Sequence, residues 1–196
     1  MFDIVLFQPQ IPPNTGNIIR LCANSGAQLH LIQPLGFSLD VKSCRRAGLD
    51  YRELVDVTQW PDFQSYRNSV PQKRIWPITK FGSTRYDAAP IGGDDALLFG
   101  SETAGLPAEV TDMFDESEKL YLPMIPGTRA LNLSNAVAIC LYDAWRQVGF
   151  PEWAEIFDSR HLERVGDHAK NIAEATIYME TGALSAIEQQ EDTETT

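Results

Sequence analysis

The chain has 196 residues, 43% of them apolar, and a formal net charge of −11; this composition suits a globular protein and excludes collagen-like and wholly disordered classes. No apolar run approaches the ~20 residues of a membrane span, and the start lacks the basic region of a signal peptide, so we expect a cytoplasmic protein. Cys22, Cys44 and Cys140 are expected to be reduced thiols and not a disulfide framework or a zinc site.

The negative charge is concentrated near the carboxyl terminus. Residues 151–196 carry a net charge of −8, whereas residues 1–150 carry only −3 and contain basic clusters at 42–52 and 73–85. The acidity therefore argues against non-specific binding of nucleic acids, but it leaves room for a local basic face that docks one RNA.

Alternating strands and helices are predicted through the first 150 residues. Strands are expected at 2–8, 29–32, 74–79, 96–99 and 120–122, with an extended segment at 52–57. Helices are expected at 41–49, 61–68 and 132–148, and a first one, capped by Asn14 or Thr15, runs to Ser25. This order favours an α/β fold with a mostly parallel sheet and helices on both faces.

A different pattern begins after residue 151. Apolar residues recur there at helical spacing along a narrow stripe, and the last residues are polar and acidic. We therefore expect a main domain at 1–150, a helical tail at 151–188 and a disordered end at 189–196.

Small and polar residues concentrate in three loops that follow predicted strands, at 9–16, 100–107 and 123–135. Parallel sheets bind ligands at the carboxyl ends of their strands, and these loops offer many backbone donors but few titratable groups, namely Arg20, Glu102 and Arg129. Such a pocket suits a ligand recognised by its adenine and ribose. The loop at 100–107 lacks the Lys-Ser/Thr of a phosphate loop, and no histidine has metal-ligand spacing, so no metal is expected.

Three motifs in these regions resemble those of the SPOUT-class RNA 2′-O-ribose methyltransferases. They are IVLFQPQIPPNTGNIIRLCANSGAQLHLIQPLGF at 4–37, LLFGSETAGLP at 97–107 and LYLPMIPGTRALNLSNAVAICLYDAWRQ at 120–147. The sequence is most similar to the small bacterial enzymes that methylate wobble nucleotide 34, a cytidine or uridine, of tRNA. The resemblance implies a trefoil knot in the carboxyl-terminal half of the sheet, a homodimer, S-adenosylmethionine as cofactor and the tRNA anticodon stem-loop as partner.

The same resemblance implies the residues that hold the cofactor, largely through their main chains. These residues are Ile78, Gly100, Leu122 and Ala130. Ala130 replaces a serine that is frequent in close relatives, and Ala104 replaces a frequent arginine in the wider class. Both changes put the strength of binding in question more than the type of reaction.

Catalytic roles are likewise implied by the resemblance. Arg20 either helps to remove the proton of the ribose 2′-OH or positions a phosphate with its guanidinium fork. Asn14 holds the first motif loop, and Glu102 bonds main chain or Arg20. Ser134 and Asn135 are expected to cap the long helix and line the site. Tyr142 either faces the substrate or packs in the core.

Two alternatives remain open, and the tail adds a weaker resemblance. The same chemistry could act on another tRNA or rRNA position, or the chain could be a non-catalytic module that binds an adenosyl ligand or RNA. Residues 159–182 resemble the last helix of PhoU-type regulators, whose carboxylate motif is matched only by Glu163 and Asp167. One helix cannot supply the several facing carboxylates of a bundle metal site.

Overall fold

The computed structural model describes residues 1–38 and 57–151. Several predicted features lie outside the described residues. They are the helix at 41–49, Cys44, most of the extended segment at 52–57, and the tail with its end. The main unit spans Met1–Phe150, and it is the part that carries all three motifs.

One parallel sheet forms the centre of this unit, which confirms the predicted fold class. Its strands are β1 (Asp3–Phe7), β2 (Gln28–Ile32), β3 (Val57–Trp60), β4 (Ile75–Ile78), β5 (Thr84–Arg85), β6 (Ala96–Phe99) and β7 (Leu120–Tyr121). They run in the order β3-β2-β1-β6-β4-β7-β5, and every neighbouring pair is parallel. The two-residue strand β5 was not predicted, because two residues are too few to show a hydrophobic pattern.

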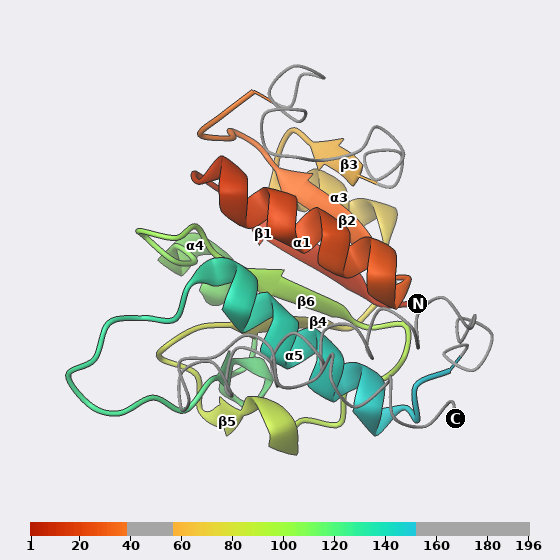
Figure 1. Ribbon diagram of the computed structural model, residues 1–196, viewed down its shortest axis with the longest axis vertical. Coiled ribbons are helices and arrows are strands. Elements are labelled where there is room, and N and C mark those ends of the chain that lie inside the picture. Colours follow the sequence, from red (N-terminus) through yellow and green to blue (C-terminus); the bar gives the residue numbers. More distant parts are fainter. Residues whose placement is uncertain (39–56, 152–196) are drawn as a thin grey trace, which may run out of the picture. The chain divides into compact units, whose positions relative to one another are not determined.

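Helices cover both faces of the sheet (Figure 1). One face is covered by α1 (Pro12–Ser25) and α5 (Leu133–Gln147), whose apolar residues share a core with β1, β2 and β6. A second core lies between the other face and the short helices α3 (Phe63–Ser69) and α4 (Ala108–Thr111). Single turns of 3₁₀ helix at Tyr86–Ala88 and Glu116–Glu118 complete the described elements.

The first helix begins before the predicted cap, so the expectation that Asn14 or Thr15 caps it is wrong. Its N-cap is Ile11, which supplies no side-chain hydrogen bond, and Pro12 and Pro13 follow as the first helical residues. Proline is tolerated there because it has no N–H to satisfy and its φ angle already suits a helix. Asn14 is therefore inside the helix, with its side chain free for another role.

Strand order places three loops at one edge of the sheet. The chain builds β1, β2 and β3 in one direction and then crosses to β4, after which β6 inserts between β1 and β4. The carboxyl ends of β1, β6 and β7 thus open on the same edge, as the sequence predicted for the loops at 9–16, 100–107 and 123–135. No helix among the described residues is long and apolar enough to cross a membrane.

The two described cysteines, Cys22 of α1 and Cys140 of α5, pack into the core as free thiols. Burial raises the pKa of each thiol to about 12. A thiol is the unreactive form of cysteine, so both residues act as small apolar side chains, as predicted.

A buried polar cluster lies at the start of β1, on the α3 side of the sheet. The Asp3 carboxylate is 1% exposed and accepts hydrogen bonds from Lys73 Nζ at 2.6 Å and Tyr66 Oη at 2.8 Å. His30 Nε2 lies 3.3 Å from the same carboxylate, and His30 Nδ1 accepts from Trp60 Nε1 at 3.1 Å. Burial raises the pKa of Asp3, but the interactions with His30, Lys73 and Tyr66 outweigh burial and leave the pKa below its ordinary value.

Asp3→Asn is expected to lower the free energy of unfolding by about 1.5–3 kcal/mol at pH 7, the range for hydrogen bonds to a charged group. Because the pKa of Asp3 is lower in the folded protein than in the unfolded chain, the carboxylate contributes fully to the free energy of unfolding above pH ~4. This contribution is lost as the pH falls through the pKa of Asp3 in the folded protein. Urea unfolding of both proteins from pH 3 to pH 7 measures this difference. Asp94→Asn, at an exposed pair with the amino terminus, is the control and should change nothing measurable. A loss that stays constant down to low pH would contradict the role of the Asp3 charge.

Candidate functional site

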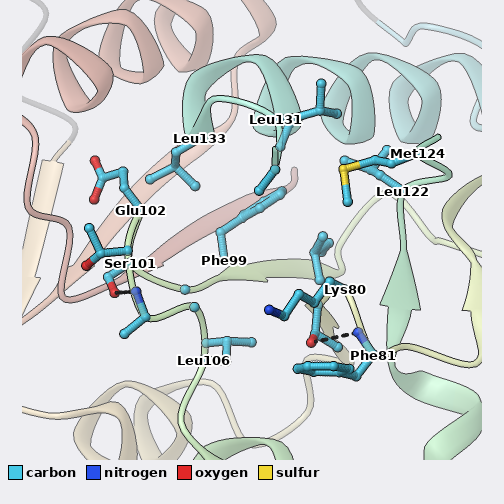
Figure 2. A pocket seen from close by; sticks show the side chains of 18 residues that line it. Lys80, Phe81, Phe99, Ser101, Glu102, Leu106, Leu122, Met124, Leu131 and Leu133 are labelled. Atoms are coloured by element: carbon cyan, nitrogen blue, oxygen red, sulfur yellow. Dashed lines mark hydrogen bonds between the residues drawn. The ribbon is translucent and has the colours of Figure 1, made fainter. Parts of the chain in front are cut away.

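A cavity of about 220 Å³ opens at the carboxyl edge of the sheet, between the loops that follow β4, β6 and β7. All four residues predicted to hold the cofactor, Ile78, Gly100, Leu122 and Ala130, line it. Figure 2 shows Ser101 and Glu102 on one side of this cavity, with Lys80 on the other. Two of the three loops that the sequence singled out, those at 100–107 and 123–135, therefore meet around one hollow, whereas no residue of the loop at 9–16 lines it.

Gly100 lies where two stretches of backbone cross. A Cβ atom built on it would lie 2.0 Å from the carbonyl carbon of Gly105 and 2.2 Å from the nitrogen of Leu106. The turn closes through a hydrogen bond from the Gly105 nitrogen to the Ser101 oxygen at 2.9 Å, and Gly105 adopts a φ of +71°. Glycine is required at both positions, at the first for space and at the second for backbone conformation.

Glu102 ties the loop after β6 to the start of α1. Its two carboxylate oxygens accept from the backbone nitrogen of Gln10 at 2.8 Å, that of Ile11 at 3.1 Å and the Asn14 side-chain amide at 3.0 Å. An acceptor that lies 91 residues from Ile11 in the sequence thus serves the start of α1, which has no side-chain cap of its own. The predicted main-chain role of Glu102 fits these contacts.

Asn132 links the third loop to the same network and was missed by the sequence prediction. Its amide donates to Asn14 Oδ1 at 2.8 Å, while its Oδ1 accepts from the Ser134 nitrogen at 2.9 Å and from Ser134 Oγ at 2.6 Å. Asn132 is therefore the cap of α5, and the prediction that Ser134 and Asn135 cap this helix is wrong. An asparagine immediately before a long apolar helix was the available signal.

Glu102 is the one catalytic candidate in the described lining of the cavity, and the expectation that Ser134 and Asn135 line it is wrong. The candidates outside the lining are Asn14, Arg20, Ser134, Asn135 and Tyr142. Arg20 is exposed on α1, and Asn135 is exposed in the first turn of α5. Tyr142 is 43% exposed on α5, with its ring edge-on to Trp145 at a centroid distance of 5.6 Å, so core packing does not describe it. Within one chain, the residues assigned to the reaction thus divide between the cavity edge and the outer surface of the α1–α5 layer.

The cavity fits an adenosyl group. Its lining is mostly apolar side chains and glycine- or alanine-bearing backbone, and Lys80 and Glu102 are the only ionisable residues among the described ones that line it. Glu102 is occupied by three N–H donors, so the interior carries little free charge. No three metal-binding side chains come together within residues 1–38 and 57–151.

Glu102→Gln is expected to loosen the junction of these loops, because an amide NH₂ would face one of the three N–H donors. We expect a loss of about 1–3 kcal/mol in unfolding free energy together with weaker binding of S-adenosylhomocysteine. Thermal unfolding and titration calorimetry measure the two effects. Glu109→Gln, on the exposed surface of α4, is the matched control. Unchanged stability and affinity in the Glu102 variant would show that the carboxylate contacts are dispensable.

Residues 1–142 match the model of the SpoU rRNA Methylase family. The chain is 51% identical over 150 residues to the tRNA (cytidine(34)-2'-O)-methyltransferase of Aeromonas hydrophila, covering 76% of this chain and 96% of that protein. It is 48% identical over 151 residues to the enzyme of the same name from Escherichia coli K12, covering 77% and 96%.

Solved structures agree with these relatives. One, described as structural insights into the 2-OH methylation of C/U34 on tRNA, is 40% identical with a TM-score of 0.70 and covers 76% of this chain and 96% of that chain. The SpoU methyltransferase AviRb from Streptomyces viridochromogenes, in complex with the cofactor AdoMet, is 25% identical with a TM-score of 0.64 and covers 74% and 57%.

Proposed function

This chain belongs to the SpoU rRNA methylase family, and we propose that it transfers a methyl group from S-adenosylmethionine to the ribose 2′-oxygen of wobble nucleotide 34, a cytidine or modified uridine, in tRNA. The observation that carries this function is the meeting of the second and third motif loops around one backbone-lined cavity, to which Glu102 ties the first motif. The relatives support the substrate, because this chain covers 96% of wobble-cytidine methyltransferases that are about half identical to it.

When bound, S-adenosylmethionine supplies an electrophilic methyl group on a positively charged sulfur. Ile78, Gly100, Leu122 and Ala130 would hold it, with contacts made mostly by backbone atoms. Glu102 keeps the loops in place, and its oxygens already accept three hydrogen bonds, so it is a positioning residue and not the acceptor of the 2′-OH proton. Catalysis of this kind depends mainly on holding the ribose oxygen in line with the methyl group.

Arg20 is the residue that we assign to the substrate. Its guanidinium either assists removal of the 2′-OH proton or holds an adjoining phosphate in a two-pronged contact. It does not line the cavity of its own chain, which supports a homodimer in which Arg20 of one subunit serves the cavity of the other. The exposed Ile139 and Tyr142 of α5 offer apolar surface for that association, and tRNA as substrate implies a cytoplasmic location.

We also assign the implied trefoil knot to the carboxyl edge. Later strands insert between earlier ones, with β6 between β1 and β4 and β7 between β4 and β5. Backbone crosses backbone closely at Gly100 and again at Gly82, where a Cβ would lie 2.5 Å from the carbonyl carbon of Leu120. Knots are almost absent from other folds, and a chain trace of a crystal structure through these crossings tests the assignment.

The substrate is tested with two synthetic anticodon stem-loops that differ only at nucleotide 34, one with ribose and one with 2′-deoxyribose. With labelled S-adenosylmethionine, the ribose form should gain label and the deoxy form should not. Equal labelling of both would place the methyl group elsewhere. If the dimeric protein binds the cofactor but transfers no label to unmodified RNA, the result favours the alternative of a non-catalytic module.

A further inference from the structure

Phe81 is the most exposed large apolar side chain in the described part of the protein, at 78%. It follows β4 by three residues and lines the rim of the cavity (Figure 2). Ile78, Gly100 and Leu122, which are assigned to the cofactor, are only partly exposed, so a molecule held by them would leave most of the Phe81 ring open to a ligand that arrives from solvent. An exposed aromatic ring at the rim is therefore available to the substrate.

The turn that carries Phe81 is anchored on both sides. The backbone nitrogen of Thr79 donates to the Leu120 oxygen at 2.8 Å, and those of Ser83 and Thr84 donate to the Lys119 oxygen at 3.1 Å. The Phe81 nitrogen donates to Thr79 Oγ1 at 3.3 Å. The ring is thus presented from a fixed backbone, which lowers the entropy that a ligand must overcome on binding.

A positive charge lies over one face of the Phe81 ring. Lys80 Nζ is 4.8 Å from the Phe81 ring centroid, and no carboxylate within residues 1–38 and 57–151 pairs with this ammonium group. An aromatic ring that is 78% exposed, with an unneutralised cation over one of its faces, matches a nucleotide, whose base stacks on the other face while its phosphate attracts the cation.

We propose that Phe81 and Lys80 form a stacking platform for a nucleobase of the anticodon loop, with the base on the Phe81 ring and a neighbouring phosphate at Lys80. The proposal rests on the proposed function, because it assigns the RNA side of the same cavity. It gives the bare catalytic unit a means to hold an unpaired base beside the ribose that reacts.

Steady-state kinetics on an anticodon stem-loop test the platform through a series of variants. Phe81→Ala should raise the KM for RNA by about 5- to 150-fold, the range for loss of one base–aromatic stack. Phe81→Trp should stay near the wild type, whereas Phe81→Leu, which keeps an apolar side chain without an aromatic face, should behave like the alanine variant. The affinity for S-adenosylhomocysteine should not change in any of them. Met113→Ala, exposed beyond α4 on the other face, is the control.

Salt and abasic RNA separate the two parts of the platform. The KM increase from Lys80→Ala should shrink when salt is raised from ~50 to ~200 mM, because it reflects one phosphate contact, whereas that from Phe81→Ala should persist. For the wild type, an RNA without the stacked base should raise the KM by the same factor as Phe81→Ala does on the intact RNA. On that RNA, Phe81→Ala should raise the KM no further.

Three results would overturn the platform. They are a wild-type KM in Phe81→Ala or Phe81→Leu, a loss of S-adenosylhomocysteine affinity equal to the KM increase, and dissociation of the dimer in Phe81→Ala seen by sedimentation. Failure of the proposed function is distinct, since the wild type would then methylate no anticodon stem-loop at all.

Discussion

Arg20→Ala is expected to lower the rate of methyl transfer to tRNA by at least about a hundredfold, the usual cost of removing one charge-stabilising group from an active site. Arg20 lies on the exposed side of α1 and away from the cavity of its own chain, so fold and affinity for S-adenosylhomocysteine should both be retained. Single-turnover kinetics and calorimetry measure the two quantities. Loss of S-adenosylhomocysteine binding would show that the assigned role is wrong.

Two further measurements separate the possible roles of Arg20. Arg20→Lys keeps the charge and loses the fork, so it should retain part of the activity if the residue positions a phosphate. Mixing inactive Arg20→Ala with an inactive, cofactor-defective variant should restore about a quarter of the wild-type rate if Arg20 serves the partner's cavity, because about half of the dimers are then heterodimers and each heterodimer contains one complete site of two. No recovery in confirmed mixed dimers would place Arg20 and the cofactor in the same chain.

Gly100→Ala supplies such a cofactor-defective variant and has the second largest expected effect. A methyl group at this position would meet backbone atoms of Gly105 and Leu106 at 2.0 and 2.2 Å. Backbone cannot move aside as a flexible side chain can, so the turn that lines the cavity must shift. We expect the affinity for S-adenosylhomocysteine to fall by at least about a hundredfold, which corresponds to ~2.7 kcal/mol.

Gly93→Ala is the matched control, because a Cβ at Gly93 meets nothing within 4 Å. Circular dichroism and thermal unfolding of both variants establish that they fold. A folded Gly100→Ala protein with wild-type affinity would show that the turn at 100–106 does not shape the cofactor site.

The sheet and the long helices could be predicted because their signals are local. Ala96–Phe99 is a continuous apolar run and was predicted to the residue, whereas β2 differs from its predicted range by one residue at its start and α5 by one residue at each end. The start of α1 was misplaced because its cap comes from Glu102, which is remote in sequence. No local pattern reports a hydrogen-bond acceptor that is supplied by a loop so remote in sequence.

Part of the site could also be predicted because its signals are local. Backbone-lined loops at the carboxyl ends of parallel strands indicate the edge of the sheet where a ligand binds, and the motif around Gly100 marked the centre of that edge. The hydrogen-bond chain from Glu102 through Asn14 to Asn132 joins three loops, and pairings of this kind depend on tertiary geometry. The exposure of Tyr142 could not be foreseen, because an aromatic residue on an apolar helix is equally consistent with the core.

The most direct test of the function is mass-spectrometric mapping of total tRNA that lacks wobble methylation, after incubation with this protein and S-adenosylmethionine. The proposed function predicts a gain of one methyl group on the ribose of nucleotide 34 in a subset of tRNAs. It also predicts that no other nucleotide changes and that Arg20→Ala protein produces no gain. A methyl group on a base, or on the ribose of any other nucleotide, would contradict it.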